Sequence, residues 1–468
     1  MTLTLYHHAT KKKKPFHPIE PSHVRLYVCG PTVYDDIHIG NARPMVVFDV
    51  LVRLLRRLFP RVTYARNITD VDDKIIQRAQ QTQQTPHALA QQMTDLFHQR
   101  MEALHVAPPD LEPRATDHMD AIHHLIGALL KSGHAYEACG HVLFHVPSLP
   151  DYGALSGRTT EHMRAGERVD VSDYKRSPLD FVLWKPSKKG EPAWTSPWGD
   201  GRPGWHIECS AMSHACLKTP FDIHGGGIDL LFPHHENEQA QSCCGYHTDV
   251  MAQFWLHNGS IEIGDAKMSK SLGNDIRLGA LLQEHPTEAL RYFLLQTHYR
   301  QPIQWHKDAL AQARSALDTL YHAIETCHDD RDDSQEKKTL VPCDVTEALL
   351  DDMNTPLAFA HLHKHGKNLR KDVTGTKRTE ALRAFSVARD ILAIITRSPK
   401  EWFQTMHDND QTTVDMIESL IKQRVEAKTQ RNYDQADAIR TQLHGMGIAI
   451  EDKADGSVQW KRRIQKKA

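Results

Sequence analysis

The chain has 468 residues, enough for about two to four domains with a large core. Its hydrophobic content of 40% and charged content of 25% are ordinary for a globular protein, and its net charge of −2 excludes a globally basic polyanion-binding protein. Charge is uneven, because Lys11 to Lys14 form a basic run and five of the last eight residues are Lys or Arg. Local nucleic-acid contacts and plain solvated surface both remain open for these runs.

The N-terminus lacks the basic and then apolar order of a signal peptide. No apolar stretch approaches the roughly 18 residues that a membrane span requires, so we expect a cytoplasmic protein. The eight cysteines follow no framework of regular spacings, which suits a reducing compartment and favours metal ligation over disulfides.

The first hundred residues alternate between strand and helix patterns. Val24 to Cys29 predicts a strand, a glycine-bearing loop follows, and apolar residues from Met45 to Leu58 fall at helical spacing. Val62 to Thr69 predicts the next strand, and D-V-D-D-K is an acidic start to another long helix. The sequence therefore predicts an α/β fold with a doubly wound, Rossmann-like parallel sheet whose ligands bind at the carboxyl ends of the strands.

From about Thr116 the pattern changes to a helix, a hairpin-like run over 135–146 and a polar segment to Gly201. An insertion between the two halves of the sheet explains this better than continued alternation. The sheet then resumes with a helix over 204–216, a strand over 220–224, a helix opened by Pro233 and a strand over 250–257. Beyond Ser260 the composition turns helical, and the charged run 329–338 is the expected boundary. The predicted helices there are 287–298, 306–327, 345–370, 377–397, 414–430 and 433–443, with two short strands near Ile448 and Val458.

Half of a metal site is visible on the helix that Pro233 opens. His234 and Glu238 stand at i and i+4, so both side chains leave on one face, and an imidazole with a carboxylate is half of a zinc site. Cys29 and Cys209 are candidates for the other half. Cys216, Cys243 and Cys244 lie nearby in sequence, and a buried cysteine is more often a small apolar residue than a ligand.

Two further stretches suggest phosphate chemistry. In His38-Ile39-Gly40-Asn41 an imidazole stands at a helix start, where it and the helix amides face the same anion. Lys267 and Lys270 lie in K-M-S-K-S between Gly264 and Gly273, which suits a loop that closes over a triphosphate. Taken singly, each stretch is more often a solvent-facing surface loop. The pair, in this order on a doubly wound sheet, indicates adenylyl transfer.

H-I-G-N with K-M-S-K-S resembles the signature pair of class I aminoacyl-tRNA synthetases. Y-V-C-G-P-T-V-Y-D, N-I-T-D-V-D-D-K, G-R-P-G-W-H-I-E-C-S-A-M and F-P-H-H-E-N-E-Q-A-Q-S resemble the cysteinyl-tRNA synthetases in particular. The resemblance runs from about Tyr27 to Trp460. Asn41 departs from it, because the class motif has a second histidine there, although asparagine can still donate a hydrogen bond.

The resemblance implies a cysteine-tRNA ligase that forms cysteinyl-adenylate from L-cysteine and ATP and transfers the aminoacyl group to tRNA(Cys). It implies one Zn²⁺ per chain, Mg²⁺ with ATP, and a monomer. The implied metal ligands are Cys29, Cys209, His234 and Glu238; the catalytic residues are His38, Lys267 and Lys270; and the ATP-binding residues are His38, Gly40, Asn41 and Lys270.

The substrate pocket is less specified. Asp229 suits the substrate α-ammonium or, as readily, a turn. Thr69, Trp205 and His224 stand at sheet edges or helix starts, and Trp205 suits closure over a small substrate, although core packing is the usual role of tryptophan. Serine is nearly isosteric with cysteine, and a shaped pocket rejects such an analogue by only about 10²-fold. A thiol of pKa about 8.5 can instead bond zinc as a thiolate, so no editing domain is required.

Near the C-terminus, Arg424, Lys428, Arg431 and Arg440 stand on helices that precede Trp460. A basic surface with an exposed aromatic suits unpaired bases, and a solvated helical face is the alternative. With the resemblance, the expected divisions are 1–115 and 204–260 as the halves of the catalytic domain, 116–203 as the connective insertion, 261–328 as the K-M-S-K-S loop and stem-contact region, 339–400 as a helical bundle, and 401–468 as a small mixed α/β anticodon-binding domain.

Three other functions compete. A cysteine ligase with an amino-sugar acceptor would need no extended C-terminal region, and a non-catalytic zinc-dependent RNA-binding protein leaves K-M-S-K-S unexplained. A zinc peptidase is disfavoured because Gln239 stands where H-E-x-x-H requires histidine.

Overall fold

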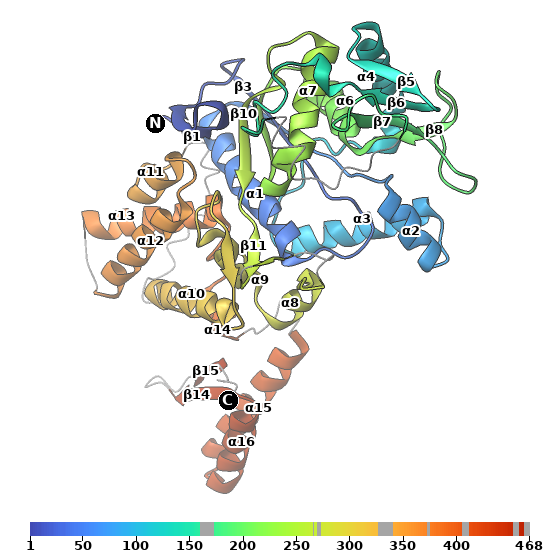
Figure 1. Cartoon of the computed structure of the whole chain (residues 1–468). Coiled ribbons are helices and arrows are strands. Elements are labelled where there is room, and N and C mark those ends of the chain that lie inside the picture. The colour runs from blue at the N-terminus through green and yellow to red at the C-terminus, as the bar shows by residue number, and fades with distance from the viewer. Residues whose placement is uncertain are drawn as a thin grey trace.

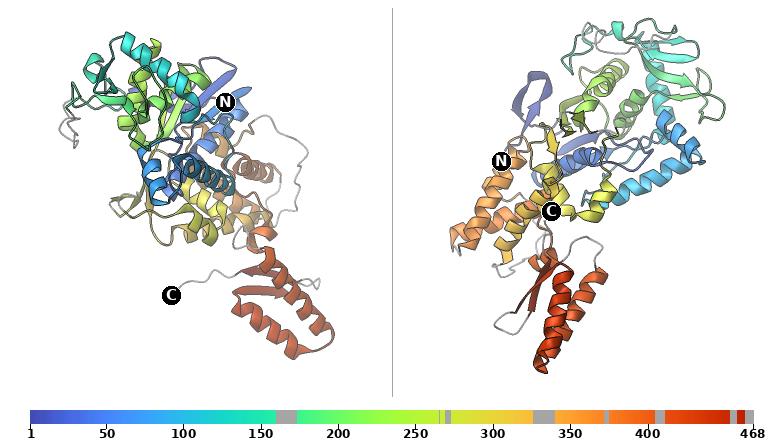
Figure 2. Two further views of the ribbon diagram at one scale, coloured as in Figure 1. Left: turned by 90° about the vertical axis from the view of Figure 1, so that its right-hand side faces the viewer. Right: turned by 60° about the horizontal axis from the view of Figure 1, so that its bottom comes forward.

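The computed structural model describes residues 1–159, 173–264, 266–268, 273–325, 340–371, 375–404, 411–452 and 458–462. Figure 1 shows a large body built on a central sheet, a lobe with β5 to β8 at one end of it, and a helical region with α11 to α13 beside it. Two helices and a strand pair near the C-terminus, α15, α16, β14 and β15, project away from that body (Figures 1 and 2). Within the described residues, no helix is long and apolar enough to cross a bilayer.

The central sheet has four parallel strands in the order β10-β9-β3-β4. Its first half runs from β3 (His23–Val28) through α1 (Ile39–Leu58) to the edge strand β4 (Arg61–Arg66). Its second half runs from β9 (Phe221–Gly227) through α7 (Glu236–Tyr246) to the other edge, β10 (Ala252–Asn258). The predicted doubly wound parallel sheet is confirmed. From β3 the sheet grows on one side to β4 and on the other side to β9 and β10, so the strand order reverses between β3 and β9, and ligands bind at such a switch point.

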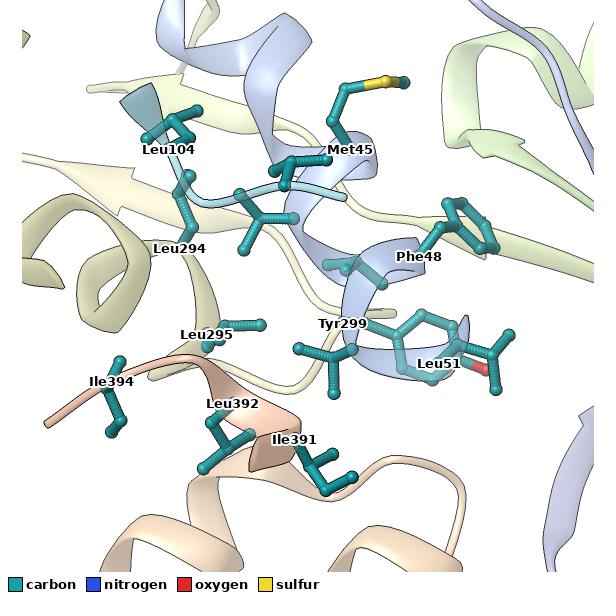
Figure 3. Packing of buried hydrophobic residues seen from close by; sticks show 14 of the residues in the cluster. Met45, Phe48, Leu51, Leu104, Leu294, Leu295, Tyr299, Ile391, Leu392 and Ile394 are labelled. Carbon is teal, nitrogen blue, oxygen red and sulfur yellow. The ribbon is translucent and has the colours of Figure 1, made fainter. Parts of the chain in front are cut away.

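Helix α1 is the centre of the largest hydrophobic core. Figure 3 shows Met45, Phe48 and Leu51 along α1, with buried residues of α9 (Thr287–Leu295) and of η7 (Ala388–Leu392) in the same cluster. Each fully buried side chain of this kind contributes about 1.5–3 kcal/mol. The close approach of α1 to β9 depends on Gly225, because a Cβ there would lie 2.3 Å from the Phe48 ring. The middle of α1 therefore packs closely on β9.

The insertion forms an antiparallel sheet in chain order β5-β6-β7-β8, packed on α4. The predicted hairpin over 135–146 is confirmed as β5 and β6, whereas β7 and β8 lie in the stretch predicted only as polar. Lys185 of β7 and Arg202 of β8 both bind Asp73 at the first turn of α2, the lysine at 2.7 Å. These ion pairs fasten the insertion to the first half of the sheet. The bounds are α4 (Met119–Lys131), β5 (Ala135–Ala138), β6 (His141–Phe144), β7 (Phe181–Pro186), β8 (Gly201–Pro203) and α2 (Asp73–Gln81).

A small sheet follows β10 in the order β12-β11-β13, and helices continue from it. It consists of β11 (Ile261–Ile263), β12 (Ala266–Lys267) and β13 (Ile303–Trp305). The helices are α8 (Leu278–Glu284), α9, α10 (Ala309–Glu325), α11 (Asp344–Leu350), α12 (Thr355–Arg370), α13 (Thr376–Val387) and α14 (Pro399–Gln404).

Three predicted helices are wrong in extent. The helix over 345–370 is broken into α11 and α12, because Asp352 and Met353 take φ of 58° and 50°. The carboxylate of Asp352 binds Tyr6, Tyr299 and Arg300 at this break. The helix over 377–397 ends as α13 and the π-type turn η7. The helix after D-V-D-D-K is only α2, and a separate α3 (Pro86–Ala103) starts at the Thr85 cap.

The basic run near the N-terminus forms part of a hairpin that the sequence did not predict. Strands β1 (Thr4–His7) and β2 (Lys12–Pro15) pair antiparallel. Lys13 Nζ lies 2.7 Å from Asp351 Oδ1, and both side chains are largely exposed, so this pair contributes little stability.

The C-terminal unit comprises α15 (Gln411–Thr429), α16 (Tyr433–Gly445), β14 (Ile448–Asp452) and β15 (Val458–Arg462), and it has its own small core. Trp460 belongs to that core with 3% exposure, so the expectation of an exposed aromatic at this position is wrong. Arg424 is likewise buried and binds both oxygens of Asp452 at 2.8 and 2.9 Å. Lys428 binds the same carboxylate. The two-pronged pair of the buried Arg424 with Asp452 ties α15 to β14, whereas the exposed Lys428 adds little stability.

Candidate active site and metal centre

Four donor side chains converge where the two halves of the sheet meet. Cys29 directly follows β3, Cys209 stands on α6 (Trp205–Leu217), His234 lies in the turn η5 (Leu231–His235), and Glu238 lies in the first turn of α7. The prediction that Pro233 opens the helix is confirmed, since Phe232 has extended dihedrals and the helical backbone that starts after it runs through His235 into α7. His234 and Glu238 are therefore one helical turn apart, and His234 Nε2 lies 3.0 Å from Glu238 Oε1.

The three distances from Cys29 to the other donors fit a tetrahedral ion, and the 3.0 Å between His234 Nε2 and Glu238 Oε1 is slightly shorter. Cys29 Sγ lies 3.6 Å from Cys209 Sγ, 3.5 Å from His234 Nε2 and 3.3 Å from Glu238 Oε1. Donors about 2.0–2.3 Å from a tetrahedral zinc ion lie about 3.3–3.8 Å from one another. All four side chains are buried, and two sulfurs, one nitrogen and one oxygen suit zinc better than magnesium or calcium. The structure thus brings the predicted ligand set together.

A second group of four donors overlaps the first: Cys29 and Glu238 again, with His224 and His235. Since the two groups share two residues, one ion cannot use both fully. His224 Nε2 lies 2.9 Å from Glu238 Oε2, the oxygen that faces away from His234, whereas His235 Nε2 is 3.9 Å from Glu238 Oε1. We therefore assign His224 as the partner that orients the carboxylate, the arrangement usual around metal ligands.

The ring of His234 is fixed from behind by a residue that sequence reasoning missed. His206 Nδ1 lies 2.8 Å from His234 Nδ1, which leaves Nε2 of His234 for the cluster. Burial lowers the pKa of His206 to about 3, so its ring is neutral. His206 Nδ1 therefore accepts a hydrogen bond from the N–H of His234 Nδ1. His206 precedes Cys209 by three positions on one helix, and that spacing was the available signal.

The pKa values of the two thiols are shifted in opposite directions. The hydrogen bond from the Cys29 thiol lowers the pKa of Cys209 to about 6, so Cys209 carries the thiolate. Burial raises the pKa of Cys29 well above its usual range, with the Cys209 and Glu238 charges adding to the effect. Burial opposes the charged form of His234, but Glu238 and Cys209 outweigh it and raise its pKa to about 10. The cluster thus holds protons that a bound cation would displace.

Close backbone approach shapes the floor of the site. A Cβ on Gly30 would lie 1.7 Å from the carbonyl oxygen of Asn67, so only glycine fits beside Cys29. Asn67 Oδ1 accepts from the amide of Gly30 at 2.9 Å, and its Nδ2 donates to Thr69 Oγ1 at 3.2 Å. Asn67, which the sequence did not single out, thereby ties the end of β4 to that of β3. Thr69 is buried at this edge.

Trp205 and Asp229 are the exposed members of the predicted substrate pocket. Trp205 is 40% exposed and stacks on His234 with ring centroids 4.3 Å apart, so its role is not core packing. A substrate that reached His234 would contact this indole. Asp229 is exposed, and its carboxylate lies 3.1 Å from Lys267 Nζ. The structure therefore pairs Asp229 with the K-M-S-K-S segment, and its predicted contact with an α-ammonium stays a prediction.

His38 and Asn41 form a reciprocal cap at the start of α1. His38 Nδ1 accepts from the amide of Asn41, and Asn41 Oδ1 accepts from the amide of His38, both at 3.3 Å. The histidine ring folds over Gly40, where a Cβ would lie 2.8 Å from Cε1. The asparagine that departs from the class motif thus completes a capping box.

The predicted phosphate loop is described only in part. Lys267 lies on β12, whereas Lys270 and the rest of 269–272 fall outside the described residues. The segment after the loop docks directly on α1, since the amide of Ile39 donates to Ile276 O at 3.0 Å and the amide of Leu278 to Ile37 O at 3.0 Å. Arg277 also binds Asp35 at 2.8 Å. The two predicted phosphate motifs are therefore neighbours in the fold.

A cavity of about 590 Å³ lies on the other side of α7, lined among others by Glu236, Cys243, Cys244 and Trp255. At about 100° per residue, these α7 positions face away from His234 and Glu238. None of the predicted site residues lines this cavity, so we keep the donor cluster and the start of α1 as the candidate site.

Comparison with known proteins gives one consistent result. Residues 15–315 match the family described as tRNA synthetases class I (C) catalytic domain, and residues 344–395 match the DALR domain. The chain is 50% identical over 463 residues to a cysteine–tRNA ligase of Rhodospirillum centenum, covering 99% of this chain and all of that protein. It is 49% identical over 463 residues to the cysteine–tRNA ligase of Rhodospirillum rubrum, with the same coverage.

Solved structures support the fold at much lower sequence identity. A Mycobacterium tuberculosis methionyl-tRNA synthetase in complex with methionyl-adenylate has a TM-score of 0.56 at 14% identity, covering 84% of this chain and 93% of that one. A leucyl-tRNA synthetase (LeuRS) of Agrobacterium radiobacter K84, in a ternary complex with tRNA, has a TM-score of 0.56 at 12% identity, covering 83% and 86%. These likenesses concern the fold alone.

Proposed function

The chain belongs to the cysteine–tRNA ligase family of class I tRNA synthetases, and on that premise we propose how its site divides the work. It activates L-cysteine with ATP and ligates it to tRNA. We assign Cys29, Cys209, His234 and Glu238 to zinc, and the start of α1 with Lys267 and Lys270 to ATP. The observation that carries the proposal is the convergence of the four buried donors, all within 4.8 Å of one another, beside the exposed Trp205 at the switch point.

Substrate selection follows from the donor set. Bound zinc would supply a bond to the thiolate of cysteine that the much less acidic hydroxyl of serine matches poorly. Among the four donors Glu238 is the most readily displaced, and His224 holds its second oxygen. Trp205 covers the donor cluster from the solvent side, and Thr69 lines its floor. Asp229 accepts the substrate α-ammonium in this proposal, which requires release of its ion pair with Lys267.

Activation is assigned to the other half of the site. The positive end of the α1 dipole and the Nε2 of His38 face the phosphates in this proposal, and Gly40 leaves room for their approach. Asn41 holds the His38 ring through the capping box. Lys267 and Lys270 neutralise charge that develops as the substrate carboxylate attacks the α-phosphorus and pyrophosphate leaves. Mg²⁺ accompanies ATP in this proposal.

Cysteine-dependent exchange of radiolabelled pyrophosphate into ATP tests the function directly. The zinc-loaded protein should support exchange with cysteine and not with serine, and should charge total tRNA with cysteine. Exchange that is indifferent to cysteine would overturn the assignment. An amino-sugar ligase would show the exchange without tRNA charging, and a non-catalytic RNA-binding protein would show neither. Both alternatives are set aside because the full-length likeness is to cysteine–tRNA ligases.

We propose that the C-terminal unit contacts tRNA through Tyr433. This residue is 62% exposed at the start of α16, whereas Trp460 and Arg424 are internal. Arg431 and Arg440 lie on the same two-helix segment and are exposed. The division of the chain into the six expected parts, the monomeric state and the cytoplasmic location stay predictions.

Replacing Tyr433 by alanine should weaken tRNA binding about 5- to 100-fold, because stacking on an unpaired base contributes about 1–3 kcal/mol. Cysteine-dependent pyrophosphate exchange should be unchanged. The measurements are tRNA affinity by filter binding and the exchange rate. Leu382→Ala is the matched control, since Leu382 is an exposed side chain of α13 outside this unit. Equal tRNA affinity for Tyr433→Ala and the wild type would remove Tyr433 from the contact surface.

A further inference from the structure

Arg43 is a fully buried arginine on α1, five residues after His38 and so about one and a half turns further along the helix. Its guanidinium donates to the carbonyl oxygens of Gly259 at 2.6 Å, Ser260 at 2.9 Å and Gln301 at 2.7 Å, with a longer contact to His298 O at 3.4 Å. Burial lowers the pKa of Arg43 to about 9, which leaves it charged at neutral pH. One cation therefore joins α1 to two separate turns.

These two turns lead directly into β11 and β13 of the small sheet that carries Lys267. Ser260 stands between β10 and β11, and Gln301 precedes β13. The turns touch, since the amide of Ile303 donates to Ser260 O at 2.9 Å, and a Cβ on Gly259 would lie 2.4 Å from Gln301 O. One strand further on, β11 pairs with β12, and the amide of Met268 donates to Ile261 O at 2.8 Å. The path from Arg43 to the K-M-S-K-S segment is short and hydrogen-bonded throughout.

We infer that Arg43 is a positioning residue for adenylyl transfer, and that its guanidinium fixes the sheet carrying Lys267 at a set distance from the helix start carrying His38. The inference rests on the proposed assignment of these two motifs to ATP. Arginine suits the task because its rigid fork serves several carbonyls at once, whereas lysine is a single flexible ammonium. A misplacement of about 1 Å between catalytic groups can cost about 10²-fold in rate.

The competing explanation is that Arg43 only stabilises the fold, and Arg291 is the matched control for it. Arg291 is also fully buried and donates to the carbonyl oxygens of Leu392 at 3.1 Å and Leu104 at 2.9 Å, besides binding Asp49 at 2.7 Å. None of its described contacts reaches the turns at Gly259 and Gln301. A lysine at either position keeps the charge and removes the fork.

The test compares Arg43→Lys with Arg291→Lys in the zinc-loaded, full-length protein, by single-turnover formation of pyrophosphate from ATP and cysteine. The amplitude reports the folded, competent fraction, and the rate constant reports positioning. Arg43→Lys should keep the wild-type amplitude and zinc content while its rate constant falls about 10- to 100-fold, and its KM for cysteine should stay within about twofold. Arg291→Lys should change the amplitude and leave the rate constant as in the wild type.

A rate constant for Arg43→Lys within about twofold of the wild type would overturn the inference, as would an equal loss in Arg291→Lys. If Arg43→Lys is insoluble, Gly259→Ala is the second variant, because its added Cβ would push apart the two turns that Arg43 joins. It should also slow pyrophosphate formation, and a wild-type rate constant in this variant would overturn the inference. Absence of cysteine-dependent exchange in the wild type counts against the proposed function instead.

Discussion

Cys209→Ser is expected to release zinc and to lower cysteine-dependent pyrophosphate exchange by at least about 100-fold, the scale at which even outer partners of metal ligands act. A serine hydroxyl is far less acidic than a thiol and does not replace a thiolate donor. The Cys29 thiol also loses the sulfur that accepts its hydrogen bond. Residual selection of cysteine over serine should fall to the roughly 10²-fold that pocket shape alone provides. Metal analysis together with exchange assays on both amino acids measures these effects.

Cys244→Ser is the matched control for this prediction. Cys244 is a buried cysteine of α7 that lines the cavity on the opposite side of the helix, and burial raises its pKa to about 11. Its replacement should leave zinc content and amino-acid preference as in the wild type. Retention of zinc and of full selectivity by Cys209→Ser would remove the residue from the metal centre, and equal losses in both variants would point to general damage.

His38→Asn is expected to lower the rate of exchange by about 10²–10³-fold while the protein stays folded. Asparagine is a preferred N-cap residue, so it can still receive the amide of the first turn that His38 Nδ1 now accepts. It cannot place a donor where the imidazole Nε2 stands. Loss of one such donor to a transition state costs on this scale. Steady-state exchange kinetics and thermal unfolding, measured on the same preparation, separate the two roles.

His38→Ala is the companion variant, because it removes the cap as well as the donor. It should add a loss of stability of about 0.5–2 kcal/mol to the same loss of rate. If His38→Asn exchanged as fast as the wild type while His38→Ala was slow, the histidine would act only as a cap, and the phosphate contact would have to come from the helix amides.

The sequence predicted the parts of this site that depend on local spacing and strand order. His234 and Glu238 meet because they are four residues apart, and Cys29 meets them because parallel strands end at one edge. What it missed arises from contacts between distant segments. Asn67 acquires its role only when the ends of β3 and β4 lie side by side, as its bond to Gly30 shows.

The errors in helix extent also have physical causes. Apolar spacing continues through Asp352 and Met353, so the pattern gives no sign that their backbone turns left-handed to serve Tyr6 and Arg300. Trp460 was expected at the surface because cations surround it in sequence. In the fold, Arg424 forms an ion pair with Asp452, and the Trp460 indole packs in the core formed by α15, α16 and the strand pair.

Among the described residues, the hydrophobic cluster of the C-terminal unit has six buried side chains, which include Ile417, Leu443 and Trp460. Units of this size are marginally stable without an additional tie, which Asp452 here provides through its bidentate pair with the buried Arg424. On warming, this appendage should melt ahead of the body. Over that interval the protein would still make cysteinyl-adenylate but would lose the proposed tRNA contacts of this unit, so translation would fail from loss of recognition before loss of chemistry.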